Sequence, residues 1–253
     1  MPRLTDPSDI RARLERDRIW SAFSMADLDE PYAAHAHWFG DADPAALVLV
    51  YAAFQPPIVY MQGESDACGR ILGQEDVVRL TGAGWLNVLP AHREAVSGRF
   101  ASFAARRMVR MVLAPESFRP VTHLPVVRLG PADLSDLQAL YADDRPAFFV
   151  PSQLADGIYY AVREEGRLVS VAGTHVLSEG GRVGALGNVY TRPECRGRGL
   201  AAAATSAVCA ELLARGITTI VLNIIATNDP ARRVYERLGF SEYCVYEEGE
   251  ARR

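Results

Sequence analysis

A glycine- and arginine-rich stretch between an apolar run and an alanine-rich helical pattern constrains this chain more than any other segment. Residues 188–201 read NVYTRPECRGRGLA. Unpaired peptide N–H groups in the first turn of a helix attract anions, helped by the positive end of the helix dipole. Glycines let the backbone approach a phosphate closely, and arginines add charge that can be bidentate. The order predicts a strand, an anion-binding loop and a helix start.

Length and composition bound the remaining possibilities. A chain of 253 residues exceeds the usual size of one domain, so we expect two. Hydrophobic residues make up 49% and charged residues 23%, which predicts a packed core. A formal net charge of -4 argues against a general nucleic-acid surface and leaves room for an anionic small ligand.

Cysteine and histidine spacing gives no metal site. The four cysteines are widely spread, with no C-x-x-C or Cys/His ligand pattern. His35 and His37 could share one face of a strand, but no third ligand lies nearby. The amino end is charged rather than apolar, and no run is long enough to span a membrane. We expect a cytoplasmic protein with free thiols and no metal.

The first 115 residues predict a small α+β lobe to which the sequence assigns no chemistry. Ser8 is the expected N-cap of a first helix, and the paired prolines Pro56 and Pro57 mark a turn between two antiparallel strands. The expected helices cover 8–18, 74–80 and 90–100, and the expected strands cover 45–54, 58–63, 85–89 and 108–113.

Prolines around 116–125 predict a linker, and the pattern beyond it is regular. His123 fits a linker residue better than a catalyst. The domain expected over 126–253 has strands at 126–129, 157–163, 167–176, 183–191, 217–226 and 240–246, and helices at 131–141, 200–215 and 229–238. The three strands before the glycine cluster should be antiparallel, giving a mixed α/β sheet with helices on both sides.

Two motifs in this second half resemble those of one known superfamily. Arg196 to Ala201 resembles the R/Q-x-x-G-x-G/A coenzyme A signature of the GNAT N-acetyltransferases, and NDPARRVYERLGF (228–240) resembles their N-x-x-A-x-x-x-Y-x-x-x-G-F element. The resemblance covers roughly 126–246 and looks most like the glycine-N-acyltransferase and FR47-like branch. It implies a GNAT-like, mostly antiparallel twisted sheet flanked by helices. The smaller α+β lobe before it could be a degenerate GNAT-like half, although it lacks the R-x-x-G-x-G/A string.

The resemblance also implies a binding site for acetyl-CoA as cosubstrate. The strand that pairs with the pantetheine arm would supply Val189, Tyr190 and Thr191. Asn228 would contact the cofactor near the second helix, and Arg198 could equally be a solvent-exposed partner of the 3′-phosphate. The loop that would hold the pyrophosphate consists of Arg196, Gly197, Arg198, Gly199, Leu200 and Ala201.

Direct acyl transfer requires a deprotonated amine, donors for the developing oxyanion and an acid for the departing thiolate. The resemblance gives the last role to Tyr235, as general acid beside the coenzyme's sulfur. A backbone N–H near Val189 or Tyr190 would be the oxyanion donor. His175 and Glu179 are candidate bases, although structural or solvated roles suit them as well.

Other polar residues near this region have weaker claims. Tyr159 and Tyr160 are adjacent in a strand, so at most one lines the acceptor site. Asp143 and Asp144 could bind an amine or form a solvated turn. Cys195 could form an acyl-enzyme, but direct transfer needs no nucleophile.

The function expected is an N-acyltransferase that moves acetyl from acetyl-CoA to a primary amine of a small molecule or amino acid, by direct attack in a ternary complex. The alternative is a CoA-binding sensor or scaffold module without turnover. We expect no nucleic-acid or membrane partner, and the sequence leaves monomer and homodimer open.

Overall fold

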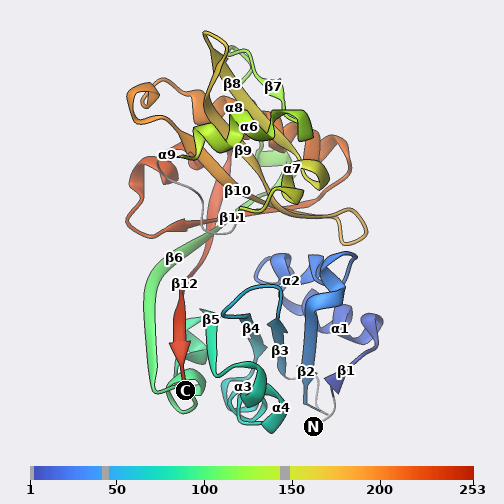
Figure 1. Cartoon of the computed structure of the whole chain (residues 1–253). Coiled ribbons are helices and arrows are strands. Elements are labelled where there is room, and N and C mark those ends of the chain that lie inside the picture. Colours follow the sequence, from blue (N-terminus) through green and yellow to red (C-terminus); the bar gives the residue numbers. More distant parts are fainter. Residues whose placement is uncertain (1–2, 42–45, 143–148) are drawn as a thin grey trace. The chain divides into compact units, whose positions relative to one another are not determined.

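The computed structural model describes residues 3–41, 46–142 and 149–253 (Figure 1). The chain forms two compact units: Met1–Arg110 together with Cys244–Arg253, and Met111–Tyr243. The expected domain boundaries, with a linker at 116–125, stay a prediction. The final strand runs from the second unit back into the first, so the last ten residues do not belong to the second unit.

The first unit contains strands, short helices and the beginning of a long strand. Their bounds are β1 Arg3–Leu4, α1 Pro7–Leu14, α2 Ala22–Ala26, β2 Ala36–Gly40, β3 Ala46–Tyr51, β4 Ile58–Gly63, α3 Ser65–Leu72, α4 Glu75–Leu80, β5 Ala83–Val88, α5 Arg93–Ser97 and β6 Ser102–Leu113. Strands β1 to β4 are antiparallel neighbours, and β5 joins β4 in parallel.

The second unit contains the longer helices. Its elements are β7 Val127–Arg128, α6 Leu134–Leu140, α7 Ser152–Asp156, β8 Tyr159–Glu164, β9 Arg167–Ser178, β10 Val183–Thr191, α8 Leu200–Ala214, β11 Thr219–Ile225 and α9 Asp229–Leu238, followed by the beginning of β12 Phe240–Arg252, which ends in the first unit. Strands β7 to β10 are antiparallel, and β11 joins β10 in parallel.

The two units repeat one topology. Each begins with a short edge strand and two helices and continues through three antiparallel strands. The chain then crosses to a strand parallel to the third, through α3 and α4 in the first unit and through α8 in the second. The parallel pairs are β4 with β5 and β10 with β11. The mixed, mostly antiparallel fold expected from the sequence is confirmed, and the first unit has the architecture of a second half of the same kind.

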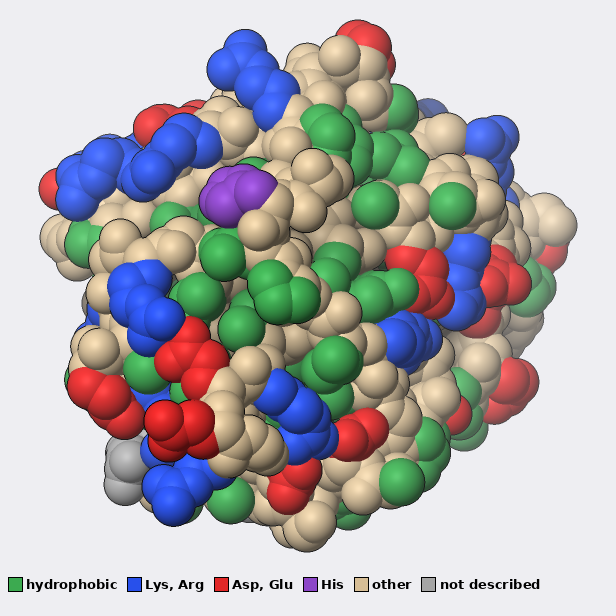
Figure 2. All heavy atoms as spheres, turned by 90° about the horizontal axis from the view of Figure 1, so that it is seen from above, with side chains coloured by type: hydrophobic (Ala, Val, Ile, Leu, Met, Phe, Trp, Pro, Cys, Tyr) green, Lys and Arg blue, Asp and Glu red, His purple; other side chains and the backbone are tan. Residues whose placement is uncertain are grey.

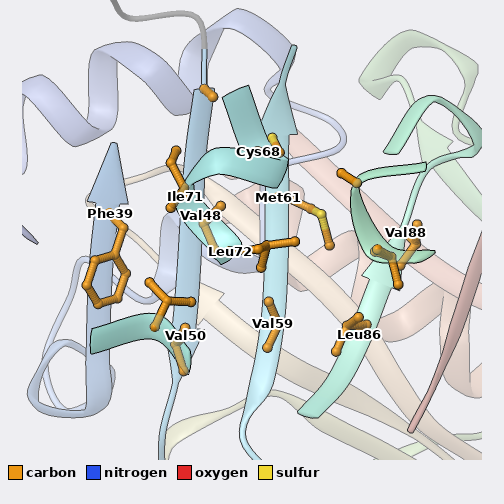
Figure 3. Packing of buried hydrophobic residues seen from close by; sticks show 14 of the residues in the cluster. Phe39, Val48, Val50, Val59, Met61, Cys68, Ile71, Leu72, Leu86 and Val88 are labelled. Atoms are coloured by element: carbon orange, nitrogen blue, oxygen red, sulfur yellow. The ribbon is translucent and has the colours of Figure 1, made fainter. Parts of the chain in front are cut away.

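The core of the first unit lies between one sheet face and its crossover helices (Figure 3). Val48 and Val50 point from β3 to the same face because they are two positions apart in a strand. Ile71 and Leu72 of α3 cover them. Helix α3 packs beside α5: a Cβ added at Gly69 would lie 3.6 Å from the Ala95 backbone, which is ordinary contact.

Several details of the first unit differ from the sequence expectation, and β1, β2 and α2 were not among the expected elements. Helix α1 begins at Pro7, and its N-cap is Asp6 rather than Ser8: the Asp6 carboxylate accepts from the Ser8 N–H at 2.9 Å. The helix expected over 90–100 is a 3₁₀ turn, Pro90–His92, followed by the shorter α5. Helix α3 was not expected at all, because Gly69 interrupts an otherwise helical pattern.

The surface seen in Figure 2 carries arginines and acidic residues interspersed rather than in one large patch of a single sign. This arrangement agrees with the small net charge. Within the described ranges, no helix is long and apolar enough to cross a membrane.

Candidate functional site

Strands β10 and β11 part near their carboxyl ends. Their parallel ladder runs from Val183–Thr219 to Leu186–Leu222, although β10 continues to Thr191 and β11 to Ile225. On its other side β10 has an irregular register with β9 between Gly187 and Tyr190. An irregularity of this kind bends a strand and re-aims its groups. The result is an open stretch of β10, residues 187–191, whose edge toward β11 has no ladder partner.

The loop after β10 delivers two left-handed glycines to the start of α8. Gly197 has φ +78°, with open space where a side chain would be, and Gly199 is the helix N-cap with φ +81°. Glycine adopts this conformation without strain. Helix α8 is 15 residues long, and no side chain among the described residues caps its first turn. A loop of this geometry can present the N–H groups and the positive end of the helix to an anion, and the expected anion cradle stays a prediction.

The two arginines of the loop are both exposed but are engaged differently. Arg196 donates from Nε to the Thr191 carbonyl at 3.1 Å, which ties the loop to the end of β10. Arg198 pairs with Glu164 at the end of β8, and this pairing raises the pKa of Arg198. A phosphate on Arg198 would therefore compete with Glu164.

Some of the remaining loop and strand residues are buried in the core, and others can be reached by a ligand. Leu200 is buried against Cys195 and two valines of the sheet, so it anchors the helix start. Ala201 is half-buried. Tyr190 packs its ring into the cluster with Tyr141 and Tyr159, which leaves its backbone as the part available to a ligand.

Asn228 caps helix α9. Its Oδ1 accepts from the Ala231 N–H at 3.2 Å, and Pro230 occupies the first turn. The residue is exposed, and its amide Nδ2 remains available for a ligand. The cap accounts for the asparagine locally, and its expected cofactor contact stays a prediction.

Tyr235 lies in α9 with only 7% of its surface exposed. Its ring packs edge-on against Phe240, with centroids 5.9 Å apart. Burial, and then the nearby Cys209 thiol of α8, raise the pKa of the Tyr235 hydroxyl. No protein hydrogen bond holds that hydroxyl among the residues described. A protonated, unengaged phenol is suited to donate to a leaving group.

His175 lies on β9 beside the point where the β10–β11 ladder ends. Its ring rests on Gly187: a Cβ added there would lie 2.1 Å from Nδ1. Burial lowers the pKa of His175 to about 4, so the imidazole is neutral at physiological pH. The neutral ring is the form that can accept a proton, but its low pKa makes it a weak base.

Glu179 lies far from this region. The β9–β10 register places Ser178 beside Val183, at the start of β10, whereas the loop follows Thr191 at its end. At about 3.3 Å per residue, these points are on the order of 25 Å apart. Glu179 is exposed and paired with Arg215 at 3.3 Å. The structure does not bring it together with the other candidate residues.

The weaker candidates also separate. Tyr159 is fully buried and Tyr160 faces the other side, where the Arg128 guanidinium lies 5.7 Å from its ring centroid. Cys195 is buried beside Leu200. Asp143 and Asp144 lie outside the described residues. In the described ranges no group of three acidic, histidine or cysteine side chains could hold a metal.

A buried polar network beside the open stretch was missed by the sequence reasoning. Asn188 has φ +55° and lies inside the register irregularity, and its carbonyl accepts from the Tyr141 hydroxyl at 2.5 Å. Its amide Nδ2 donates to Tyr159 and Gln153. The Gly187–Asn188 pair inside an apolar strand pattern was the available signal, because such a pair is typical of a bulge.

The first unit has a different arrangement at the corresponding point of its fold. There β4 ends at Gly63 and α3 follows directly, with Glu64 at the N-cap. A pocket of about 480 Å³ opens here, and His92 and Trp20 are among its walls. A carboxylate at this helix start disfavours an anion. The two units therefore differ in the feature that makes the second one a candidate phosphate site.

The match to a known protein family lies in the second unit, which holds the candidate site. Residues 131–240 match the model of the Acetyltransferase (GNAT) family. A protein from Paenarthrobacter aurescens named mycothiol acetyltransferase is 34% identical over 114 residues, which is 44% of this chain and 33% of that one. A protein of the same name from Actinosynnema mirum is 27% identical over 92% of this chain and 85% of its own length. The first of these matches thus spans about a third of the relative.

Solved structures resemble the whole chain. A putative acetyltransferase from the GNAT family of Novosphingobium aromaticivorans has a TM-score of 0.60 at 23% identity, covering 98% of this chain and 99% of its own. A GCN5-related N-acetyltransferase from Kribbella flavida has a TM-score of 0.66 at 16% identity, covering 93% and 94%. At these identities the likeness concerns the fold, and it includes both units.

Proposed function

We propose that this chain, whose residues 131–240 form a domain of the acetyltransferase (GNAT) family, is an N-acyltransferase that moves an acetyl group from acetyl-CoA to a primary amine. The observation that carries the proposal is the coincidence, in one unit, of an open strand end and an uncapped 15-residue helix that begins after two left-handed glycines. The first accommodates an extended pantetheine arm and the second a pyrophosphate.

The residues of the loop fit coenzyme A physically. Space beside Gly197 and the left-handed conformation of Gly199 let a phosphate approach the N–H groups at the start of α8. Val189, Tyr190 and Thr191 would pair with the pantetheine through their backbone. Arg196 and Arg198 add positive charge beside the same loop.

The chemistry follows from what the neighbouring groups can do. The amine nitrogen attacks the thioester carbonyl carbon, the C–N bond forms, and the C–S bond breaks with its electron pair on sulfur. A backbone N–H near Val189 or Tyr190 stabilises the charge on the carbonyl oxygen, and Tyr235 supplies the proton that the thiolate takes. The amine loses its own proton to water or to His175.

Primary amines of several chemical classes are candidate acceptors. The relatives named mycothiol acetyltransferase make mycothiol-related amines one class to include, beside amino acids and simple primary amines. The proposal retains the cytoplasmic setting expected from the sequence and leaves monomer and homodimer open.

One assay tests the proposal directly. Purified protein is incubated with acetyl-CoA and a panel of amines, and free thiol is measured, with thermal stability recorded in parallel with and without CoA. Acceptor-dependent thiol release and stabilisation by CoA are expected. Absence of both across the panel would refute the proposal.

A second candidate is a CoA-binding sensor or scaffold module. It is favoured by the candidate bases: His175 is held neutral with a pKa of about 4, and Glu179 is remote and ion-paired. Stabilisation by CoA with no thiol release from any acceptor would select it.

A further inference from the structure

The network around Asn188 has a determined hydrogen-bond direction. Tyr159 donates its only hydroxyl proton to the Thr174 carbonyl at 3.2 Å, so it must accept from Asn188, whose Nδ2 lies 2.6 Å away. The second amide proton goes to Gln153 Oε1 at 3.1 Å. The amide nitrogen of Asn188 therefore faces Tyr159 and Gln153, and its Oδ1 points away from them.

Gln153 locks the arrangement from α7. Its Oε1 also accepts from the Val150 N–H at 3.2 Å, and its Nε2 donates to the His175 carbonyl at 3.0 Å. The glutamine therefore cannot turn its amide without losing bonds at both ends. Gln153, which holds the side chain of Asn188, is therefore itself held by hydrogen bonds to the backbone of Val150 and of His175.

Two features of Asn188 reduce stability. A left-handed backbone is strained for a residue with a side chain, although asparagine tolerates it better than most. Its Oδ1 is buried with no hydrogen-bond partner in the described part of the chain. A buried acceptor without a donor is costly, and such features collect at functional sites. Packing alone would be served better by a glycine.

The backbone of Asn188 shows what the network achieves. Its carbonyl is held by the Tyr141 hydroxyl, which packs within the aromatic cluster at the end of α6. A trans peptide carries its C=O and N–H on opposite sides. Holding the carbonyl at Tyr141 therefore turns the N–H of Val189 away from α6. Neither Asn188 nor Val189 has a ladder partner on β9 or β11.

We infer that Tyr141 and Asn188 are positioning residues for acyl transfer: they orient the Asn188–Val189 peptide so that the Val189 N–H donates to the oxygen of the acyl group as charge develops on it. The inference rests on the proposed function and narrows its oxyanion donor to one N–H. The aromatic and amide partners hold the peptide before substrate arrives, so no reorganisation is needed during the reaction.

The test uses two variants that act on different parts of the network. Tyr141→Phe removes the donor to the carbonyl and keeps the ring. Asn188→Gly keeps the left-handed backbone and removes the side chain. Tyr160→Phe is the matched control, since this neighbouring tyrosine faces Arg128 on the other side of the sheet.

Binding of an analogue separates positioning from general structural damage. The probe is a trifluoromethyl ketone thioether of CoA, whose hydrated carbonyl resembles the tetrahedral intermediate, compared with CoA itself. Both variants should lose about 10- to 100-fold in affinity for the ketone and keep CoA affinity within about twofold, since an oxyanion donor acts mainly on the tetrahedral state. The kcat for acyl transfer should fall by a similar factor.

Three outcomes would overturn the inference. Ketone affinity and kcat in Tyr141→Phe could equal those of Tyr160→Phe, affinity for CoA and ketone could fall equally, or Asn188→Gly could be fully active. Because analogue binding needs no turnover, the test holds even for a protein that transfers nothing. Absence of thiol release from the parent protein would refute the proposed function separately.

Discussion

Arg198 and Glu164 form a bidentate ion pair, in which Nη1 lies 3.0 Å from Oε2 and Nη2 lies 2.5 Å from Oε1. The pair joins the glycine loop to the end of β8. Arg198 is exposed and Glu164 is half-buried, so the pair is screened by salt and Arg198 can exchange Glu164 for another anion. It holds the guanidinium beside the cradle that we assign to the pyrophosphate.

This ion pair predicts that substituting Arg198 and substituting Glu164 have different effects on the KM for acetyl-CoA. Arg198→Ala should raise the KM for acetyl-CoA about two- to tenfold, whereas Glu164→Gln should leave it unchanged or lower it, because the arginine is released for phosphate. The measurement is the KM with CoA and with 3′-dephospho-CoA thioesters. A penalty for Arg198→Ala that persists without the 3′-phosphate would rule out that phosphate as its partner.

Tyr235→Phe should lower kcat about 10- to 100-fold and leave the KM for acetyl-CoA within about twofold, because the hydroxyl acts as a proton donor. Its raised pKa keeps it protonated, so no loss of kcat from its ionisation is expected up to pH 10. An acetyl thioester of an acidic aromatic thiol should shrink the defect, since that thiolate leaves without a proton. A defect of the same size with both thioesters would assign Tyr235 to another role.

The lowered pKa of His175 predicts that the folded protein loses stability in acid. Its pKa is about 4 in the folded protein and ordinarily 6.5, so the unfolded chain binds the proton first as pH falls. Stability is therefore lost between about pH 6.5 and 4, by roughly 2 kcal/mol once partial exposure of the ring is allowed for. His175→Gln should reduce the difference in urea midpoint between pH 7 and pH 4.5.

The same variant tests His175 as a base. Because the protein disfavours the protonated ring, we expect His175→Gln to keep kcat within about fivefold of the parent. A loss of a hundredfold or more, with unchanged stability at pH 7, would instead make His175 the proton acceptor.

Asn228→Ala should destabilise the protein by about 0.5–2 kcal/mol, because the cap on α9 is lost. Asn228→Asp should restore the cap and the stability. If Asn228 also touches the cofactor, the aspartate variant should still show a raised KM for acetyl-CoA, since its charge lies near the phosphates. A normal KM in the stable aspartate variant would limit Asn228 to capping.

Much of the second unit could be predicted from local pattern. The turn between β8 and β9 is an example: Glu165 and Gly166 both have positive φ, as a two-residue hairpin requires. Gly239 is another, since it ends α9 with φ +101°, where a Cβ would lie 1.9 Å from the Ser117 carbonyl. The first unit was harder because its helices are short and Gly69 interrupts α3.

The candidate site divides in the same way. The cradle and Tyr235 follow from motif spacing, because a loop and the helix after it are local structure. The separation of Glu179 from the cradle depends on strand register, and the lowered pKa of His175 depends on burial. Strand register and burial both depend on contacts between segments that are far apart in the sequence.

The sequence by itself predicted the glycine loop and the helix that follows it, since glycines at positions needing positive φ and a following helix are local requirements. Only the tertiary structure decided that β10 and β11 part beyond Leu186 and that Tyr141 holds the carbonyl of Asn188. That bond joins residues 47 positions apart in the chain. It exists because α6 packs beside β9, and packing between distant segments is what fixes the direction of a peptide N–H.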